Sequence, residues 1–160
     1  MSKLNELLGK SELPLPVVYI NTQNGDVEIS NKVINSKDYK VRGIMITPHI
    51  EVSVKTESLF YTWKDAKNHA TENGAHLLSA KHLETYIKAK QAFKETILLL
   101  QENSDELLSW LWQGQPTWCE EEEEENNKDS SLAYTIEFDP ADCRLENKSL
   151  HYWCRLVWYH

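Results

Sequence analysis

The residues best suited to binding chemistry are concentrated between Trp110 and Asp129, where the sequence reads WLWQGQPTWCEEEEEENNKD. Aromatic faces stack on sugars or apolar groups, while amides and carboxylates add directional hydrogen bonds. Core placement is the alternative for each tryptophan. The candidates for a ligand-binding face are Trp112, Gln113, Gln115, Trp118, Glu120 and Arg144.

The run of glutamates from Glu120 to Glu125 has two interpretations. Adjacent carboxylates repel one another and cannot all be buried, which predicts a solvated, mobile loop tip. Alternatively, a carboxylate-rich loop can supply the six to eight oxygen ligands that calcium takes. We favour the solvated tip, with binding by its flanks and with no metal ion or cofactor. A Gly-Ser segment in place of Glu121–Glu125 is then expected to change stability by no more than about 0.5 kcal/mol.

Catalytic motifs are missing from the sequence. The six histidines are scattered, without H-E-x-x-H or H-x-H spacing, and no phosphate-binding glycine loop or G-x-S-x-G is present. The three cysteines, Cys119, Cys143 and Cys154, show no C-x-x-C spacing, so reduced thiols are expected, with a Cys143–Cys154 bridge left open. We therefore expect a protein that is not an enzyme.

Length and charge restrict the class of protein further. A chain of 160 residues fits one domain with a substantial core. Its 17 basic and 25 acidic residues give a net charge of −8, which argues against nucleic acid or an anionic membrane as the main partner. No apolar run is long enough for a signal peptide or a membrane span, so we expect synthesis in the cytosol without export by the general route.

A first helix is predicted to begin after Thr62, whose hydroxyl can cap it. Trp63, Ala66 and Ala70 then share one helical face, which we expect to dock with Trp63 buried against the sheet and the second helix. Gly74 is predicted to end the helix because glycine adopts the left-handed conformation without strain.

A second helix is predicted over Ala80–Glu102, with Ser79 as its cap. Its apolar stripe consists of Leu83, Tyr86, Ile87, Phe93, Ile97 and Leu100. A short helix over Asp105–Trp112 is expected to follow.

Strands are predicted on both sides of the helices. Val17–Ile20 and Val27–Ile29 flank an Asn24-Gly25 turn, which indicates a hairpin. A second pair is expected at Val41–Thr47 and Ile50–Val54. The alternation in His151–Trp158 predicts a last strand that lies centrally in a sheet, with both faces buried.

The first sixteen residues are predicted to form an N-terminal arm that precedes one domain over residues 17–160. Leu4, Leu7 and Leu8 share one side of an amphipathic segment, and the prolines of Leu13–Pro16 end it. The segment is either a disordered start or an attachment arm, in which case residues 1–12 would mediate homo-oligomer formation.

Two groups of motifs resemble the C-type-lectin-like domains. The first is W-x-D-A at Trp63–Ala66 followed by G-A-H-L-L-S at Gly74–Ser79, and the second is Tyr134–Asp139 followed by Tyr152–His160. The likeness covers residues 59–160 and is greatest to the disulfide-poor bacterial and phage branch, which includes relatives of the formylglycine-generating enzymes. In that branch a preface of short strands precedes the first helix.

The resemblance implies an α+β fold in which two helices pack on small twisted antiparallel sheets, with an N-terminal β-hairpin preface. It also implies that the irregular loop after the second helix binds ligands and that Trp118 lies in the centre of the fold. The sequence departs from calcium-dependent lectins because it has Gln115-Pro116-Thr117 and no Trp-Asn-Asp, so their ligand set is missing.

Three classes of function remain. The resemblance favours a non-enzymatic binding module for a cell-surface glycan or protein, of the kind that serves as a phage, prophage or bacterial receptor-binding or decoration protein, including in virions. The alternative is an intracellular structural or interaction protein without sugar binding. A formylglycine-generating-type enzyme ranks third, because the surroundings of Cys143 and Cys154 do not match its reactive cysteine pair.

Overall fold

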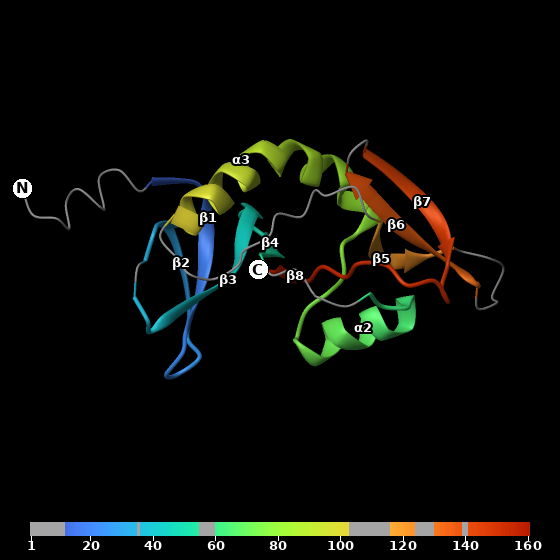
Figure 1. The fold of residues 1–160 in the computed structure, drawn as a ribbon, viewed down its shortest axis with the longest axis horizontal. Helices are drawn as coiled ribbons and strands as arrows, with labels where there is room; N and C mark the ends of the chain where they lie inside the picture. Colours follow the sequence, from blue (N-terminus) through green and yellow to red (C-terminus); the bar gives the residue numbers. More distant parts are fainter. Residues whose placement is uncertain (1–11, 35, 55–59, 103–115, 124–129, 139–140) are drawn as a thin grey trace, which may run out of the picture.

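The computed structural model of the chain describes residues 12–34, 36–54, 60–102, 116–123, 130–138 and 141–160. They form an α+β fold of two α-helices and two antiparallel sheets (Figure 1). The five-stranded sheet has the order β2-β1-β3-β4-β8 and the other has the order β5-β6-β7. The elements are β1 (Glu12–Asn21), β2 (Val27–Lys32), β3 (Tyr39–Thr47), β4 (Ile50–Ser53), α2 (Trp63–Glu72), the 3-10 turn η1 (Ala80–His82), α3 (Leu83–Glu102), β5 (Thr117–Glu122), β6 (Leu132–Phe138), β7 (Ala141–Asn147) and β8 (Val157–Tyr159).

The predicted N-terminal hairpin is confirmed as β1 and β2. Ile20 pairs with Val27 across the turn, and Gly25 has a φ of 76°, which a residue with a Cβ rarely adopts. β1 begins at Glu12, so residues 12–16, which we assigned to the arm, form the first half of a strand, and the arm's remaining residues lie outside the described part. β1 also pairs with β3, so the hairpin is part of the main sheet and not a separate preface.

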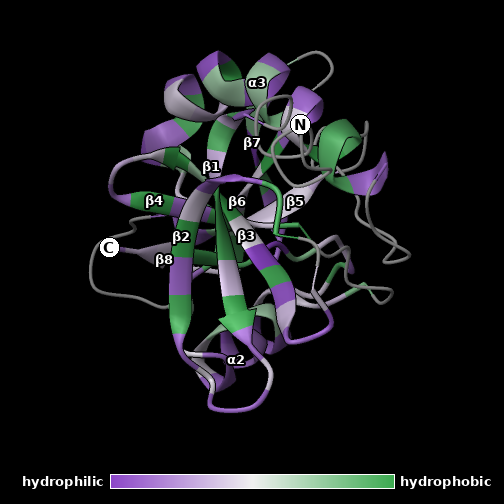
Figure 2. Ribbon diagram, turned by 90° about the vertical axis from the view of Figure 1, so that its left-hand side faces the viewer, coloured by the Kyte–Doolittle hydropathy of each residue, from purple (hydrophilic) through white to green (hydrophobic). Residues whose placement is uncertain are grey.

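The main core lies between α3 and the five-stranded sheet, across which α3 runs (Figure 1). Tyr86 and Phe93 on the helix are fully buried against the sheet's inner residues, such as Val17 and Ile44. Figure 2 shows the matching alternation of hydrophilic and hydrophobic residues along α3. Ile87 was wrongly placed in the buried stripe, since 41% of it is exposed. Neither described helix is long and apolar enough to span a bilayer.

A second core cluster joins α2 to the three-stranded sheet. The predicted cap is confirmed, because Thr62 accepts a hydrogen bond from the Asp65 backbone, and Ala66 and Ala70 are buried as expected. Trp63 is only partly buried, which corrects our expectation. Its indole NH donates to the Cys119 carbonyl on β5 at 2.8 Å, so the ring's polar edge ties the helix to the second sheet.

The last segment does not form a central strand, and that prediction is wrong. Only Val157–Tyr159 is a strand, and it lies at the edge of the five-stranded sheet beside β4. The segment runs between the two cores: Cys154 and Leu156, before the strand, pack with the second cluster, while Val157, its first residue, packs with the first. The alternating apolar residues of His151–Trp158 therefore reflect burial between the two core clusters and not a position between two strands of one sheet.

Candidate functional site

The candidate site lies on the face of the five-stranded sheet opposite α3, and a register shift between β1 and β3 creates it. Val18 pairs with Gly43 and the next residue, Tyr19, pairs with Val41, so Arg42 is the extra residue that has no partner on β1. Such a bulge redirects a side chain and is frequent beside functional sites. Arg42 is thereby turned toward Glu51 on β4 instead of continuing the strand's alternation.

Glu51 is a fully buried carboxylate that holds Arg42 with two hydrogen bonds. Arg42 Nε donates to Oε2 at 2.8 Å and Nη2 donates to Oε1 at 2.6 Å, which is the bidentate geometry that suits guanidinium and carboxylate groups. Gly43 makes room for this arrangement. A Cβ at Gly43 would lie 2.7 Å from Glu51 Oε2 and from the Val52 carbonyl, so only glycine lets the carboxylate lie against β3.

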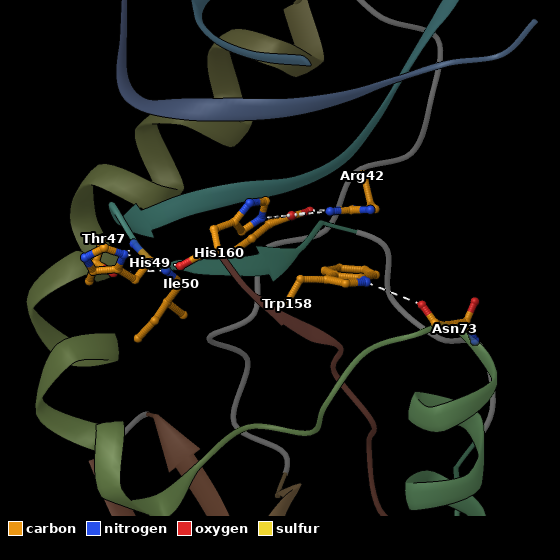
Figure 3. A network of polar contacts seen from close by, with 8 residues as sticks. Arg42, Thr47, His49, Ile50, Asn73, Trp158 and His160 are labelled. Atoms are coloured by element: carbon orange, nitrogen blue, oxygen red, sulfur yellow. Dashed lines mark hydrogen bonds and ion pairs between the residues drawn. The ribbon is translucent and has the colours of Figure 1, made fainter. Parts of the chain in front are cut away.

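His160 completes the cluster from β8's end (Figure 3). Its Nε2 lies 2.7 Å from Glu51 Oε1, and its backbone pairs with His49, whose carbonyl accepts from the His160 amide at 2.9 Å. Thr47 stabilises the turn that contains His49, because its hydroxyl accepts hydrogen bonds from the backbone amides of His49 and Ile50. The chain's last residues are thus held against Glu51.

Trp158 links this cluster to the first helix. It pairs with Glu51 across β4 and β8, and the Arg42 guanidinium carbon lies 4.4 Å from its ring centroid, a cation–π contact. Its indole NH points to the carbonyl of Asn73, the residue that caps the C-terminus of α2, at 3.4 Å (Figure 3). Arg42 is consequently fixed on two sides, by the carboxylate and by the indole.

A groove of about 350 Å³ opens beside Arg42 and Trp158, within the range of small-molecule sites. Its described lining contains two cationic side chains and no acidic one. Its lining residues are Ile20, Thr22, Lys40, Val41, Arg42, Ser53, Asn73, Leu156 and Trp158. The arrangement can hold a polar ligand, because cationic side chains, one amide and an aromatic ring line the same groove.

Of the residues proposed from the sequence, the three that the structure describes, Trp118, Glu120 and Arg144, do not line this groove. Trp112, Gln113 and Gln115 lie outside the described residues. Trp118 is fully buried in the second core, as the family resemblance implied, and its indole NH donates to the Tyr61 carbonyl at 2.7 Å. A ring with no exposed area offers no face to a ligand, so the inclusion of Trp118 in the binding face is wrong.

Glu120 and Arg144 both make polar side-chain contacts on the surface. Glu120 Oε1 lies 2.7 Å from His76 Nδ1, beside a smaller groove of about 270 Å³ at the end of α2. Arg144 Nε donates to Asp142 at 2.6 Å, and the guanidinium holds the pKa of that carboxyl below its usual range. Both side chains remain accessible, so they stay candidates for a second ligand-binding face.

The glutamate run is not a loop tip from its beginning, which corrects the sequence-based expectation. Glu120–Glu122 belong to β5. Glu121 accepts hydrogen bonds from the Ser79 hydroxyl and, at 2.9 Å, from the Ala80 backbone, so it caps the start of η1, while Glu122 pairs with Lys148. Replacing Glu121–Glu125 is therefore expected to cost more than we inferred from the sequence, and residues 124–129 lie outside the described part.

No disulfide bond joins Cys119, Cys143 and Cys154, as expected, and the thiols of Cys119 and Cys143 are poor nucleophiles. Cys119 and Cys154 are buried, and desolvation raises the pKa of Cys119 well above its usual value. Burial also raises the pKa of Cys143. Reactive cysteines need the opposite shift. The described residues contain no group of three or more histidine, cysteine or acidic side chains placed to hold a metal ion.

No model of a known protein family matches the chain, and a comparison with curated proteins finds no significant match. The assignment of a function therefore depends on the geometry of the chain itself. Sequence reasoning missed Arg42, Glu51 and His160. The one local signal was Arg42-Gly43 inside the run Val41–Ile46, whose other residues are apolar, so that a charge and a glycine interrupt the pattern of a buried strand.

Proposed function

We propose that the chain is a non-enzymatic ligand-binding module of the C-type-lectin-like type, with the Arg42 groove as a ligand site. The observation that carries the proposal is Arg42 itself. A β-bulge aims it, the buried Glu51 and the Trp158 ring fix it, and it borders a groove of about 350 Å³. A rigid guanidinium beside an aromatic ring is a common element of recognition sites because little conformational freedom remains to be lost on binding.

The fold supports the lectin-like part of the proposal. Two helices accompany antiparallel sheets, and the last strand, β8, returns to the sheet that the early strands form. The raised thiol pKa values of Cys119 and Cys143 favour a binding role over a formylglycine-generating-type activity. The proposed partner is a cell-surface glycan or protein, and the proposed setting is a phage, prophage or bacterial surface, including the virion. Tail or capsid genes next to this one in the genome would favour that setting.

A screen against a glycan array and whole cells, with and without calcium, tests the proposal. Hits are then measured again with two matched variants. Lys40→Met removes a charge from the groove, and Arg144→Met removes one from the other candidate face. Loss of binding with Lys40→Met alone supports the groove, and loss with Arg144→Met alone moves the site to β7. The absence of any hit from both screens would contradict the proposed function.

One observation favours the alternative, a structural or interaction protein. The edge strand β2 exposes Val27 and Ile29 by 46% and 51%, and both residues lie on the same face. Exposed apolar residues on an unpaired edge invite association with another chain. This role would replace ligand binding if the screens were negative and the protein formed oligomers that Ile29→Lys dissociates. The proposed oligomer contact through residues 1–12 lies almost wholly outside the described residues.

A further inference from the structure

We infer that the Arg42 groove recognises the anionic group, a carboxylate or a phosphate, of a small ligand. The inference rests on the proposed function and names the chemistry of the ligand. It depends on the hydrogen-bond donors that Arg42 has left, on the charge of the groove and on the rigidity of the site.

The donors of Arg42 are only partly used. A guanidinium carries five N–H groups in a fixed plane. Glu51 takes one from Nε and one from Nη2. In the part of the chain that the structure describes, the remaining three find no acceptor, although a quarter of the side chain is exposed. Both hydrogens of Nη1 are among them, so an oxygen atom of a ligand can be bound without breaking the pair with Glu51.

The charge of the groove is opposite to that of the chain. Overall the chain carries a net charge of −8, yet the groove holds Lys40 and Arg42 and, among the residues that the structure describes, no acidic side chain. Glu51 lies beneath Arg42 and balances one of these charges. Lys40 has no ion-pair partner among the described residues, so this part of the chain leaves the groove with one uncompensated positive charge. A purely structural role of Arg42 would need only Glu51 and would not require the second cation.

The rigidity of Arg42 favours a specific anion over a loosely held counterion. The Trp158 indole lies against one face of the Arg42 guanidinium, with its ring centroid 4.4 Å from the guanidinium carbon, and Glu51 accepts hydrogen bonds from one edge of the guanidinium. Thr22 and Asn73 add polar groups for the rest of a ligand, and Leu156 adds an apolar one. Arginine in such a fixed plane suits the two oxygens of a carboxylate or phosphate.

Three monosaccharides test the inference: glucose, glucuronate and glucose 6-phosphate. Each is titrated into ¹⁵N-labelled full-length protein, and the resonances of the Trp158 indole NH and the Arg42 Nε–H are followed. We expect glucuronate, glucose 6-phosphate or both to shift these resonances with at least tenfold higher affinity than glucose, since hydrogen bonds to charged groups are worth about tenfold or more. The difference in affinity between glucuronate and glucose 6-phosphate shows whether the groove prefers a carboxylate or a phosphate.

Lys40→Met serves as the diagnostic variant because its side chain is exposed at the rim, so the fold should not depend on it. It should weaken binding of the acid about tenfold, whereas the matched change Lys64→Met on the exposed side of α2 should leave it unchanged. Equal affinity for glucose and both acids would overturn the inference and leave the proposed function standing. Failure of all three sugars to shift the resonances would also overturn it, while the glycan and cell screens judge the proposed function separately.

Discussion

Replacing Arg42 with methionine tests whether the buried ion pair beneath the groove is organised as described. The change removes both hydrogen bonds to Glu51 but keeps an unbranched apolar side chain beside Trp158. Glu51 would remain fully buried with His160 as its remaining partner at 2.7 Å. Leaving a buried charge without its partner typically costs about 3–5 kcal/mol. Because His160 offsets part of the loss, we expect about 3 kcal/mol.

The chain provides a matched control in Arg144→Met. The pair of Arg144 and Asp142 has the same 2.6 Å separation as the pair of Arg42 and Glu51. Its side chains are 60% and 44% exposed, whereas Glu51 has no exposed area. Exposed pairs contribute about 0–1 kcal/mol, so the control should lose little stability. The two pairs differ in burial and in number of hydrogen bonds, since Arg42 donates two to Glu51 and Arg144 donates one to Asp142.

Urea unfolding, followed by tryptophan fluorescence and circular dichroism at pH 7, measures both variants. A third variant, Arg42→Met combined with Glu51→Met, removes the stranded carboxylate as well. It should recover part of the stability that Arg42→Met alone loses, since apolar groups of similar volume replace buried ion pairs well. Equal losses of under 1 kcal/mol from Arg42→Met and Arg144→Met would refute the description of Glu51 as a carboxylate that depends on Arg42.

Two further predictions concern the start of η1. Glu121→Ala should lower the free energy of unfolding, measured in urea, by about 1–2 kcal/mol, because Ser79 and Ala80 lose their hydrogen-bond acceptor. The control Glu95→Ala, at an exposed position of α3, should change it by no more than about 0.5 kcal/mol. Equal effects of the two substitutions would contradict a capping role of Glu121. Burial raises the pKa of Tyr86, so the folded state keeps a proton that the unfolded chain releases, and stability should fall as pH rises above about 10. Tyr86→Phe should lower stability at pH 7, because the Ser79 amide loses its hydrogen-bond acceptor. It should also reduce the loss of stability as the pH rises above about 10. An unchanged dependence of stability on pH between pH 9 and 11 would contradict this role of Tyr86.

Local features of the fold could be predicted from the sequence because residues within a few positions of one another determine them. The turn at Gly25 requires a positive φ, and Thr62 caps a helix through the amide three residues later. Ser79 likewise begins η1, and Gly74, with a φ of 63°, follows the end of α2. The second helix was predicted to the correct end, Glu102, because its apolar residues repeat with the helical period, but its first three residues, Ala80–His82, form the 3-10 turn η1. The period also could not show that Ile87 is exposed.

The site depended on contacts between distant segments, which no local pattern contains. Whether Arg42 continues the strand or leaves it depends on the register of β1 against β3, and a shift by one residue changes which face a side chain occupies. Glu121 looked like part of a repulsive run, yet its partner, Ala80, lies 41 residues earlier.

The burial of Glu51 shows most clearly what the tertiary structure decided. In the sequence it is one acidic residue in a short strand, and acidic residues are seldom fully buried without a partner. Its partners come from β3 and from the end of β8, 109 residues away in the case of His160. The sequence by itself determined the Gly25 turn and the helix caps at Thr62 and Ser79, because those choices are local. Only the packing of β3, β4 and β8 side by side brought a guanidinium, an imidazole and an indole around one carboxylate, because it depends on which strands become neighbours.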